Sequence, residues 1–483
     1  IKIPYSAMRF PTAYPQTWGL QLTRYIARTR EFDQWSLTPK KESNALQFWG
    51  KLDGLEDIKA PLRLSLTPYV SFIYDESPEH GDAGAIVYKE NGKASYQKGT
   101  SISGGADLKY GIDERFTIDM TLLPDFTQVK SDNKVKNLTV FETVYDENRP
   151  FFKEGTELFN KGNLFYSRRI GRTPSLYYSV PGMLNPGEVI VSNPDKANLL
   201  NATKFSGRTN KKLGIGLLNV VTGNTYATVR DSMGNERKIL TEPLTNYNIF
   251  VLDQQLKNNA DVYVINTNTM REGSAADANV AGAGFSVQDK KNKHQLSGRY
   301  ANSFRHYFAT NDTGGVELQE SSGNLYGIYL NRISGEVQWN IYQEYGDKNF
   351  NKNDLGQLFY HDFMSSGLNI NYNKYNKFWK IVKESYNYIG VNYNTKPSTG
   401  QFISSEGYVG LFFLFTNYFS VNINTGMALA EYRNEYEPRY EGRYFINPVY
   451  NWGSLNLSTN YNKSAYIDFG GRFNNVPELN NNA

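Results

Sequence analysis

The stretch FSVNINTGMAL, residues 419–429, shows the pattern that decides the fold class. Its odd-numbered positions, from Phe419 to Leu429, are mostly apolar, whereas Ser420, Asn422 and Asn424 stand between them. Successive side chains of an extended strand point to opposite faces of a sheet, so this stretch predicts a β-strand with one apolar face and one polar face.

The same alternation recurs along the chain, for example at 115–122 (RFTIDMTL), 336–341 (EVQWNI) and 455–462 (LNLSTNYN). Taken in order, such segments predict about twenty strands. The expected strands are 17–26, 44–52, 61–74, 100–111, 113–123, 197–207, 212–224, 245–257, 260–271, 279–288, 293–308, 322–332, 334–346, 364–374, 377–394, 404–415, 418–430, 440–451, 454–462 and 465–474.

The connections between these strands differ in length on the two sides. Many pairs are joined by very short turns, such as 111–112, 257–259, 332–334 and 417–418. The alternate connections are longer and polar, most clearly 75–99, 225–244, 309–321, 347–363 and 431–439. Short turns on one rim and long loops on the other are typical of an outer-membrane β-barrel, whose tilted strands of roughly 9 to 11 residues cross the bilayer. We therefore expect an all-β fold: a large antiparallel transmembrane barrel of about twenty or more strands.

Composition narrows the protein class further. The chain has 483 residues, of which 14% are aromatic, so it is not a disordered chain. Only 39% of residues are hydrophobic, and no run approaches the ~20 apolar residues of a transmembrane helix. The formal net charge of +4 gives no indication of a nucleic-acid partner. The absence of cysteine removes disulfides and thiolate metal sites.

Two soluble all-β architectures remain as alternatives. A β-sandwich also alternates, but its strands average about five or six residues, and here the strands run longer. A β-propeller would show an internal repeat of roughly 40 to 50 residues, and none is visible beyond the hairpin spacing.

One long segment, residues 124–172, does not alternate. About fifty residues without a membrane strand are unusual between two strands, and such a stretch is typically functional or folded as a unit. It combines charges of both signs with aromatic rings, and a barrel of about twenty strands has a lumen too wide for its own side chains to fill. We interpret it as a lumen plug or rim cap; an ordered external loop is the alternative. The candidate plug or lumen residues are Asp125, Glu142, Asp146, Glu147, Arg149, Phe151, Phe152, Glu154, Arg168 and Arg169.

The same segment carries a family resemblance. The run PDFTQVKSDNKVKNLTVFETVYDENRPFFKEGTELF, followed by LFYSRRIG, resembles the Gram-negative envelope proteins grouped as domain of unknown function 5916. The stretches at 3–11, 18–28, 52–69 and 204–223 are also similar to that family. The resemblance covers about the first half of the chain, and beyond residue 230 it is one of pattern only.

The resemblance implies an outer-membrane barrel and no particular activity. In that family the barrel follows a sandwich similar to family-nine carbohydrate-binding modules, so residues 1–16 are expected to be the remnant of this module and residues 17–483 the barrel. The end VPELNNNA lacks a terminal aromatic, which suggests further strands beyond it. The start at Ile1, without an export signal, suggests a mature or trimmed chain.

Motifs for covalent chemistry are weak. The four histidines, His80, His294, His306 and His361, have no metal-site spacing, and no nucleophile-elbow or Walker motif occurs. The glycines of GIGLLNVVTG and AGAGFSVQ fall inside alternating strands, where they predict bends or close contacts rather than phosphate loops.

Oxygen ligands and carboxylates leave two minor options. A calcium site could draw on acidic side chains in two loops, Asp75, Glu76, Glu79 and Asp82 or Asp132 and Asn133, although no EF-hand spacing is present. A glycosidase needs two carboxylates, and Glu142, Asp146, Glu147, Glu154 and Glu157 crowd one segment, but each has a basic neighbour, which favours ion pairs. We expect no catalytic residue, no metal and no cofactor.

Two classes of function follow. The first is an integral protein of the bacterial outer membrane, acting as a plugged channel or transporter or as a scaffold subunit of an envelope complex. Its expected partners are outer-membrane lipid and lipopolysaccharide, with other outer-membrane or periplasmic proteins. The second is a surface carbohydrate-binding or carbohydrate-processing protein, with a glycan as partner; the loop EYRNEYEPRYEGRYF at 431–445 suits sugars as well as an interfacial aromatic girdle.

Overall fold

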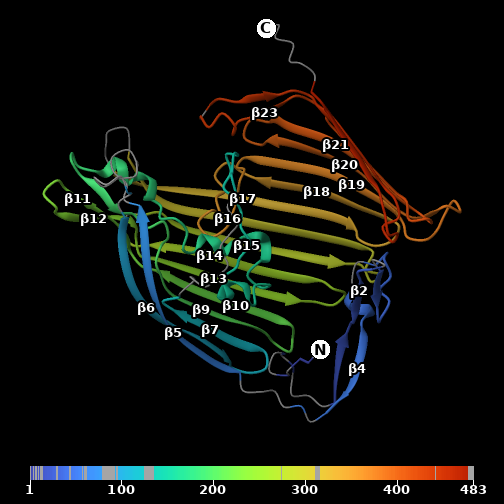
Figure 1. Ribbon diagram of the computed structural model, residues 1–483, viewed down its shortest axis with the longest axis horizontal. Helices are drawn as coiled ribbons and strands as arrows, with labels where there is room; N and C mark the ends of the chain where they lie inside the picture. The colour runs from blue at the N-terminus through green and yellow to red at the C-terminus, as the bar shows by residue number, and fades with distance from the viewer. Residues whose placement is uncertain are drawn as a thin grey trace, which may run out of the picture.

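The computed structural model is all-β, with one large antiparallel sheet (Figure 1). It describes the chain except for residues 1, 4, 6–7, 9, 11–14, 29–30, 43–44, 57, 59–62, 79–92, 94–95, 125–134, 274, 311–315, 441 and 477–483. Among the described residues, no helix is both long enough and apolar enough to cross a membrane.

Seventeen strands form the large sheet in the described part of the chain. In order of pairing they are β5 (Leu64–Pro78), β6 (Tyr96–Gly111), β7 (Phe116–Leu122), β9 (Leu199–Arg208), β10 (Leu213–Thr222), β13 (Thr245–Gln255), β14 (Asp261–Arg271), β15 (Asp277–Gln288), β16 (His294–Thr310), β17 (Val316–Arg332), β18 (Val337–Gly346), β19 (Phe363–Lys374), β20 (Val382–Lys396), β21 (Gln401–Phe415), β22 (Ser420–Ala428), β25 (Asn451–Ser458) and β26 (Asp468–Asn475). The described part of the chain thus contributes seventeen strands to this sheet, compared with about twenty or more expected for a barrel.

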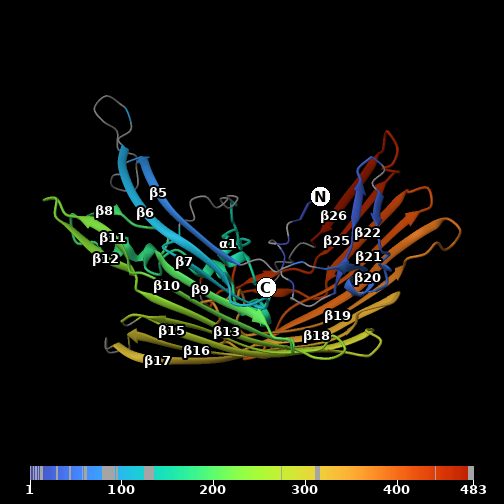
Figure 2. The same cartoon turned by 90° about the horizontal axis from the view of Figure 1, so that it is seen from below.

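The sheet is strongly curved, and its two end strands are β5 and β26. The strand order places them next to each other, but no residue pair joins them in the described ranges, where β5 pairs with β6 and β26 with β25. Figure 2 shows the resulting trough, with β5 and β26 raised on opposite sides. The large antiparallel sheet is confirmed, whereas a closed transmembrane barrel is not.

Three expected strands lie outside the large sheet. The segment 17–26 divides into β1 (Gln16–Leu20) and β2 (Thr23–Ile26), which pair with β4 (Gly50–Leu55) and β3 (Glu31–Gln34). The break falls at Gln21, whose side-chain amide bonds the backbone of Ser36 in both directions, at 2.6 and 3.0 Å. Alternation alone does not reveal such a side-chain bond.

The expected strand 44–52 is likewise replaced by a short 3-10 helix, η2 (Ala45–Phe48), followed by β4. The expected strand 440–451 yields only β24 (Phe445–Asn447), which pairs with β23 (Tyr432–Asn434) in a separate hairpin. Whether residues 1–16 are the remnant of a sandwich module stays a prediction.

The remaining elements belong to the longer connections of the sheet. A three-stranded sheet joins β8 (Val189–Ser192), β11 (Thr225–Arg230) and β12 (Glu236–Glu242). The short helices are α1 (Pro150–Lys153), η4 (Lys161–Asn163), η5 (Ser167–Arg169) and η6 (Tyr177–Met183).

The rim opposite these longer connections carries mostly short turns, as the sequence predicts, although the connections 375–381 and 459–467 are longer. The connection between β13 and β14 is a tight turn in which Asn258 and Asn259 both adopt positive φ, 57° and 53°. Asparagine tolerates this left-handed conformation, which two-residue hairpin turns require. Two connections on the long-loop rim, 272–276 and 397–400, are also short.

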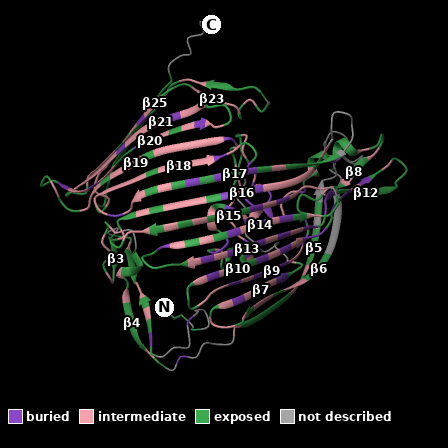
Figure 3. Cartoon of the chain, turned by 180° about the vertical axis from the view of Figure 1, so that it is seen from behind, coloured by how far each residue is buried: buried purple, intermediate pink, exposed green. Residues whose placement is uncertain are grey.

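The two faces of the sheet differ as the alternation predicts on β7, whereas on β10 and β13 the concave face is itself largely apolar, with Leu218, Val220 and Ile249 buried there. On β7, Thr117, Asp119 and Thr121 are buried on the concave face, whereas Ile118 and Leu122 point outward. Figure 3 shows the alternation as purple bands along β9 to β17. The main hydrophobic core lies on the concave face and not between two sheets.

Candidate functional site

The candidate site is the inner segment, defined here as residues 135–172, the described part of the non-alternating stretch. It carries α1, η4 and η5, and α1 lies within the hollow of the trough (Figure 2). Its buried apolar side chains are Phe152, Leu158, Phe159, Leu164, Phe165 and Ile170. They pack on concave-face side chains of seven strands from β9 to β17, namely Leu199, Ala202, Leu218, Val220, Tyr247, Ile249, Val251, Ile265, Val280, Ala301 and Leu325.

Glycines in the wall allow this close packing. A Cβ at Gly214 would lie 2.6 Å from Leu158 Cδ2, and one at Gly282 would lie 2.5 Å from Leu164 Cδ1. Neither distance is tolerated without movement of the neighbour. The glycines of the two Gly-rich stretches are therefore close-contact positions, as the sequence predicts, and the inner segment is the partner of Gly214, Gly216 and Gly282.

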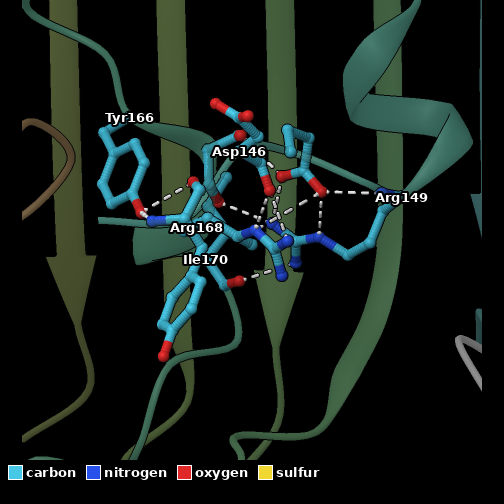
Figure 4. Close-up of polar contacts among 8 residues, drawn as sticks. Asp146, Arg149, Tyr166, Arg168 and Ile170 are labelled. Carbon is cyan, nitrogen blue, oxygen red and sulfur yellow. Dashed lines mark hydrogen bonds and ion pairs between the residues drawn. The ribbon is translucent and has the colours of Figure 1, made fainter. Parts of the chain in front are cut away.

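Arg149 is the polar centre of the inner segment. It is 8% exposed and lies at the N-terminus of α1. Its guanidinium donates to both carboxylate oxygens of Glu147, at 2.9 and 2.7 Å, and to the carbonyls of Ser167 and Ile170, each at 2.8 Å. Figure 4 shows this network, which ties residues 147–149 to η5 and the residue after it. Bidentate arginine–carboxylate pairs of this kind fix geometry as well as charge.

Glu147 stays ionised in this environment. Burial alone would raise its pKa, but the hydrogen bonds from Arg149, the positive charge of Arg149 and the hydroxyl of Ser167 outweigh burial and hold the pKa below its usual value. A general acid needs a raised pKa, so Glu147 is arranged as a structural anion.

Arg168 and Tyr166 complete the cluster. Arg168 donates through Nε to the carbonyl of Asp146 at 3.1 Å. The hydroxyl of Tyr166 donates to the carbonyl of Tyr145 at 3.1 Å and accepts from its backbone N–H at 3.0 Å (Figure 4). Asp146 thus takes part through its backbone, and its side chain is exposed.

Arg169 connects the inner segment to a loop that the sequence analysis did not assign to the site. Its guanidinium pairs with Glu142, with Nη1 2.8 Å from Oε2, and donates to the carbonyl of Gly356 at 2.7 Å. Gly356 lies in the loop 347–362, where Phe350 and Leu355 are buried in the same core. In the sequence, the two apolar residues Phe350 and Leu355 within an otherwise polar loop could have indicated that this loop is buried.

Lys204 anchors the start of the inner segment to β9. It is 3% exposed, and its ammonium donates at 2.7 Å to the carbonyls of both Phe151 and Glu154. Asp119 on β7 lies 3.6 Å away, and the ring of Phe151 lies 4.7 Å from the ammonium. The carboxylate of Glu154 pairs with Lys109 of β6. The candidate residues Phe151 and Glu154 are thus held at the wall.

Further charged pairs between the wall and the hollow were not singled out from the sequence. Lys161 of η4 lies 2.8 Å from Asp253 and 3.2 Å from Asp261. Asp253 also pairs with Arg208 at 2.5 Å. Near the long-loop rim, Asp354 of the loop 347–362 pairs with Arg271 at 2.8 Å and with Arg305 at 3.2 Å. In the sequence, each of these pairs was visible only as a charged residue on the polar face of a strand. The pairing itself was not visible, because Asp253 and Asp261, for example, lie about a hundred residues from Lys161.

Lys352 is the buried cation with the most perturbed pKa in this region. It is 5% exposed, and its ammonium donates to the carbonyl of Asn163 at 2.6 Å. Burial and the positive charge of Arg299 together lower the pKa of Lys352 to about 8, because the negative charge of Glu344 opposes them only weakly.

The structure thus brings together nine of the ten candidate plug residues; Asp125 lies outside the described residues. Within the described residues, no group of three or more His, Asp or Glu could hold a metal ion. Of the residues considered for a calcium site, Glu79, Asp82, Asp132 and Asn133 lie outside the described ranges, so that option is not examined by this structure.

A pocket of about 410 Å³ opens between the inner segment and the wall. It brings together two carboxylates and two guanidiniums, those of Glu154, Glu157, Arg115 and Arg208. The crowded carboxylates of the sequence therefore do meet a cavity, but one of mixed charge.

One of three comparisons with known proteins identifies a family, and that family has no described activity. The model of a family described as Domain of unknown function (DUF5916) matches residues 60–483. A search of curated proteins finds no match. Among solved structures, the crystal structure of Acinetobacter baumannii OccAB1 is similar at 10% sequence identity and a TM-score of 0.32, over 84% of this chain and 86% of that one.

Proposed function

We propose that this chain, which belongs to the DUF5916 family, is an integral outer-membrane protein whose sheet closes around the inner segment and whose inner segment acts as a plug. The observation that carries the proposal is the division of the sheet into an apolar convex face and a concave face that holds a fixed, charged segment.

The convex face supports lipid contact. On β14, the outward residues from the short-turn rim are Val262 and Val264, followed by Asn266; on β17 they are Leu330 and Ile328, followed after Tyr326 by Asn324. At ~3.3 Å per residue, this outward apolar stretch runs roughly 20 Å along β17 and roughly 13 Å along β14, where Asn266 ends it. The lipid-facing band of outer-membrane barrels is about 25 Å tall. Exposed apolar surface of this extent is unusual on a soluble monomer.

The concave face supports a plug. The inner segment buries six apolar side chains on the wall and is joined to the wall through Lys204 and Lys161. Arg169 joins it to the loop 347–362. A segment fixed by such a core is part of the resting structure, and a solute could pass it only if the segment moved.

Site-specific labelling tests the membrane part of this proposal. Because the chain has no cysteine, Val264→Cys and Asn340→Cys each introduce one label site, on the convex and the concave face respectively. In lipid vesicles, a quencher on the acyl chain should quench a fluorophore at position 264 strongly and one at position 340 weakly. Equal quenching at both sites, or strong quenching only at position 340, would overturn the proposal.

Conductance tests the plug. Replacing residues 124–172 by a short Gly-Ser linker should open ion-conducting steps in planar bilayers, whereas the intact protein should stay closed. The matched control is Arg230→Ala, which alters an exposed ion pair with Glu236. If the deletion variant inserts but conducts no ions, a scaffold role within an envelope complex is favoured over a channel.

The pocket of mixed charge keeps a second function open, that of a carbohydrate-processing protein. Its test is hydrolysis of surface glycans by the intact protein and by Glu154→Gln and Glu142→Gln variants. Turnover that Glu154→Gln abolishes would favour this function. Absence of turnover would remove it.

A further inference from the structure

The concave face of β16 to β21 carries a continuous row of neutral polar side chains. Asn331 donates to Gln295 at 3.2 Å, Asn340 donates to Asn331 at 2.5 Å, and Asn369 donates to Asn340 at 3.3 Å. The hydroxyl of Tyr408 then donates to Asn369 at 2.5 Å. Gln295, Asn331, Asn340 and Asn369 are direct partners in the strand register. Gly390 is the register partner of both Asn369 and Tyr408, so the Tyr408 side chain crosses over Gly390 to reach Asn369.

A second row runs beside it toward β25. The hydroxyl of Tyr388 donates to Asn424 at 3.0 Å, and Asn424 donates to Asn422 at 3.1 Å and to Ser454 at 3.5 Å. We call the two rows together the amide–tyrosine lane: Gln295, Asn331, Asn340, Asn369, Tyr388, Tyr408, Asn422, Asn424 and Ser454. None of these nine residues carries a carboxylate, ammonium or guanidinium. Charged side chains border the lane on β21 and β26, where Glu406 lies near Tyr408 and Arg472 is opposite Ser454 in the strand register.

Glycines let the tyrosine rings of this face lie against the sheet. A Cβ at Gly390 would lie 2.4 Å from Cζ of Tyr408, and one at Gly410 would lie 2.2 Å from Cε1 of Tyr388. The ring of Tyr342 occupies the corresponding space over Gly367, at 2.4 Å. Each ring therefore takes the place of a missing side chain on the neighbouring strand and keeps its other surface toward the hollow. Tyr388 is 39% exposed.

This combination of groups selects a chemical class. Amides offer donors and acceptors together, which matches hydroxyl groups that also donate and accept. Aromatic surfaces add an apolar area against which the C–H face of a sugar ring packs. A phosphate or carboxylate ligand would instead need arginine or lysine, and the lane supplies neither.

We propose that the amide–tyrosine lane binds a neutral oligosaccharide along the hollow. The inference rests on the proposed function in one respect, since the hollow is the path a solute would take once the inner segment moves. The solute is then an uncharged chain rich in hydroxyl groups. It exchanges its hydrogen bonds to water for hydrogen bonds to Asn340, Asn369 and Asn424.

The test is binding of a panel of neutral and acidic oligosaccharides to the intact protein in detergent. Neutral members of the panel should bind more tightly than acidic members of equal length. Tyr388→Ala should weaken that binding roughly tenfold or more, and Tyr388→Phe, which keeps the ring, should weaken it less. The matched control is Tyr178→Ala, because Tyr178 is 84% exposed and lies in η6, outside the large sheet; it should leave binding unchanged.

Two results would overturn the inference: no neutral oligosaccharide binds, or binding survives Tyr388→Ala and Asn424→Ala unchanged. Preferential binding of acidic oligosaccharides would overturn it as well. Failure is distinguishable from failure of the proposed function. If the labels report lipid contact but no sugar binds, only the proposed role of the amide–tyrosine lane is rejected. If a sugar binds but the labels report no lipid contact, only the membrane proposal is rejected.

Discussion

The two halves of the concave face share one backbone design and differ in what they hold. From β7 to β17, the face is covered by the inner segment and the loop 347–362, and its polar positions include buried charges such as Lys204 and Asp253. From β18 to β25, the polar positions are mainly neutral, with Asn340, Asn369 and Asn424 bonded to one another or to tyrosine.

The difference teaches how burial selects polar residues. A charge taken out of water requires an opposite charge and hydrogen bonds close by, and the inner segment provides them, for example Lys161 for Asp253. A face that water still reaches has no such requirement, and neutral amides suffice there. The same period-two alternation therefore produces a packed interface in one half and a polar wall in the other.

The largest effect should come from removing an aromatic ring from the covered half. Phe159 is 1% exposed and packs on the wall beside Gly216. Phe159→Ala should lower the free energy of unfolding by about 4 kcal/mol, through lost burial and a cavity, measured by urea unfolding in detergent micelles. The control Phe445→Ala alters a ring that is 59% exposed and should have little effect. Equal losses for both variants would contradict the assignment of the core.

A somewhat smaller loss is expected from breaking the Arg149 network. Arg149→Ala removes the guanidinium from Glu147 and from two backbone carbonyls. Glu147 keeps the Ser167 hydroxyl as a donor but loses its nearest opposite charge, so stability should fall by roughly 3 kcal/mol. Hydrogen exchange should rise across residues 145–171 and not in β18 to β22. The matched variant is Arg230→Ala, whose ion pair is about half exposed, and which should lower stability by at most about 1 kcal/mol.

Lys352 predicts a pH dependence of the covered half. Its pKa is about 8 in the folded protein and near the usual lysine value of 10.5 in the unfolded chain. Between these values the unfolded chain binds more protons, so the free energy of unfolding should rise with pH, by on the order of 2 to 3 kcal/mol in all. Below pH 8 both states are protonated and this contribution does not change.

Replacing Lys352 by methionine should remove that rise, because methionine does not titrate. The comparison is the slope of unfolding free energy against pH for the two proteins between pH 8 and pH 10.5. Identical slopes would show that Lys352 is not the buried titrating group.

The smallest effect is expected in the uncovered half. Asn340→Ala removes bonds to Asn331 and Asn369, but water can replace both, so stability should fall by less than about 1 kcal/mol. Thermal unfolding in micelles measures this. A loss of stability as large as that of Arg149→Ala would mean that the two halves of the concave face are equally buried, contrary to the difference between them.

The sequence predicts much of the sheet because alternation is a local property. Phe116 to Leu122 forms β7 with the expected faces, and the short turn at Asn258 and Asn259 occurs as expected. Alternation fails where another interaction competes with sheet pairing. Gln21 breaks the first expected strand through its bonds to Ser36, and such a bond between distant residues leaves no periodic trace.

The sequence predicted which residues belong to the candidate site but not which of them contact one another. The charged and aromatic residues of the inner segment marked it as a folded unit, and the structure packs them on the concave wall. Which charges pair could not be predicted, because Arg169 contacts Gly356 and Lys161 contacts Asp253 across long separations. The loop 347–362 was missed for the same reason.

The amino-acid sequence by itself determined that this protein is built of strands with one apolar and one polar face, since side-chain direction follows from neighbouring residues alone. Only the tertiary structure decided which part of the polar face is buried, because that depends on where the curved sheet places the inner segment. The roles of Lys204, Lys352 and Asn340 therefore became visible only when segments distant in the chain were seen in contact.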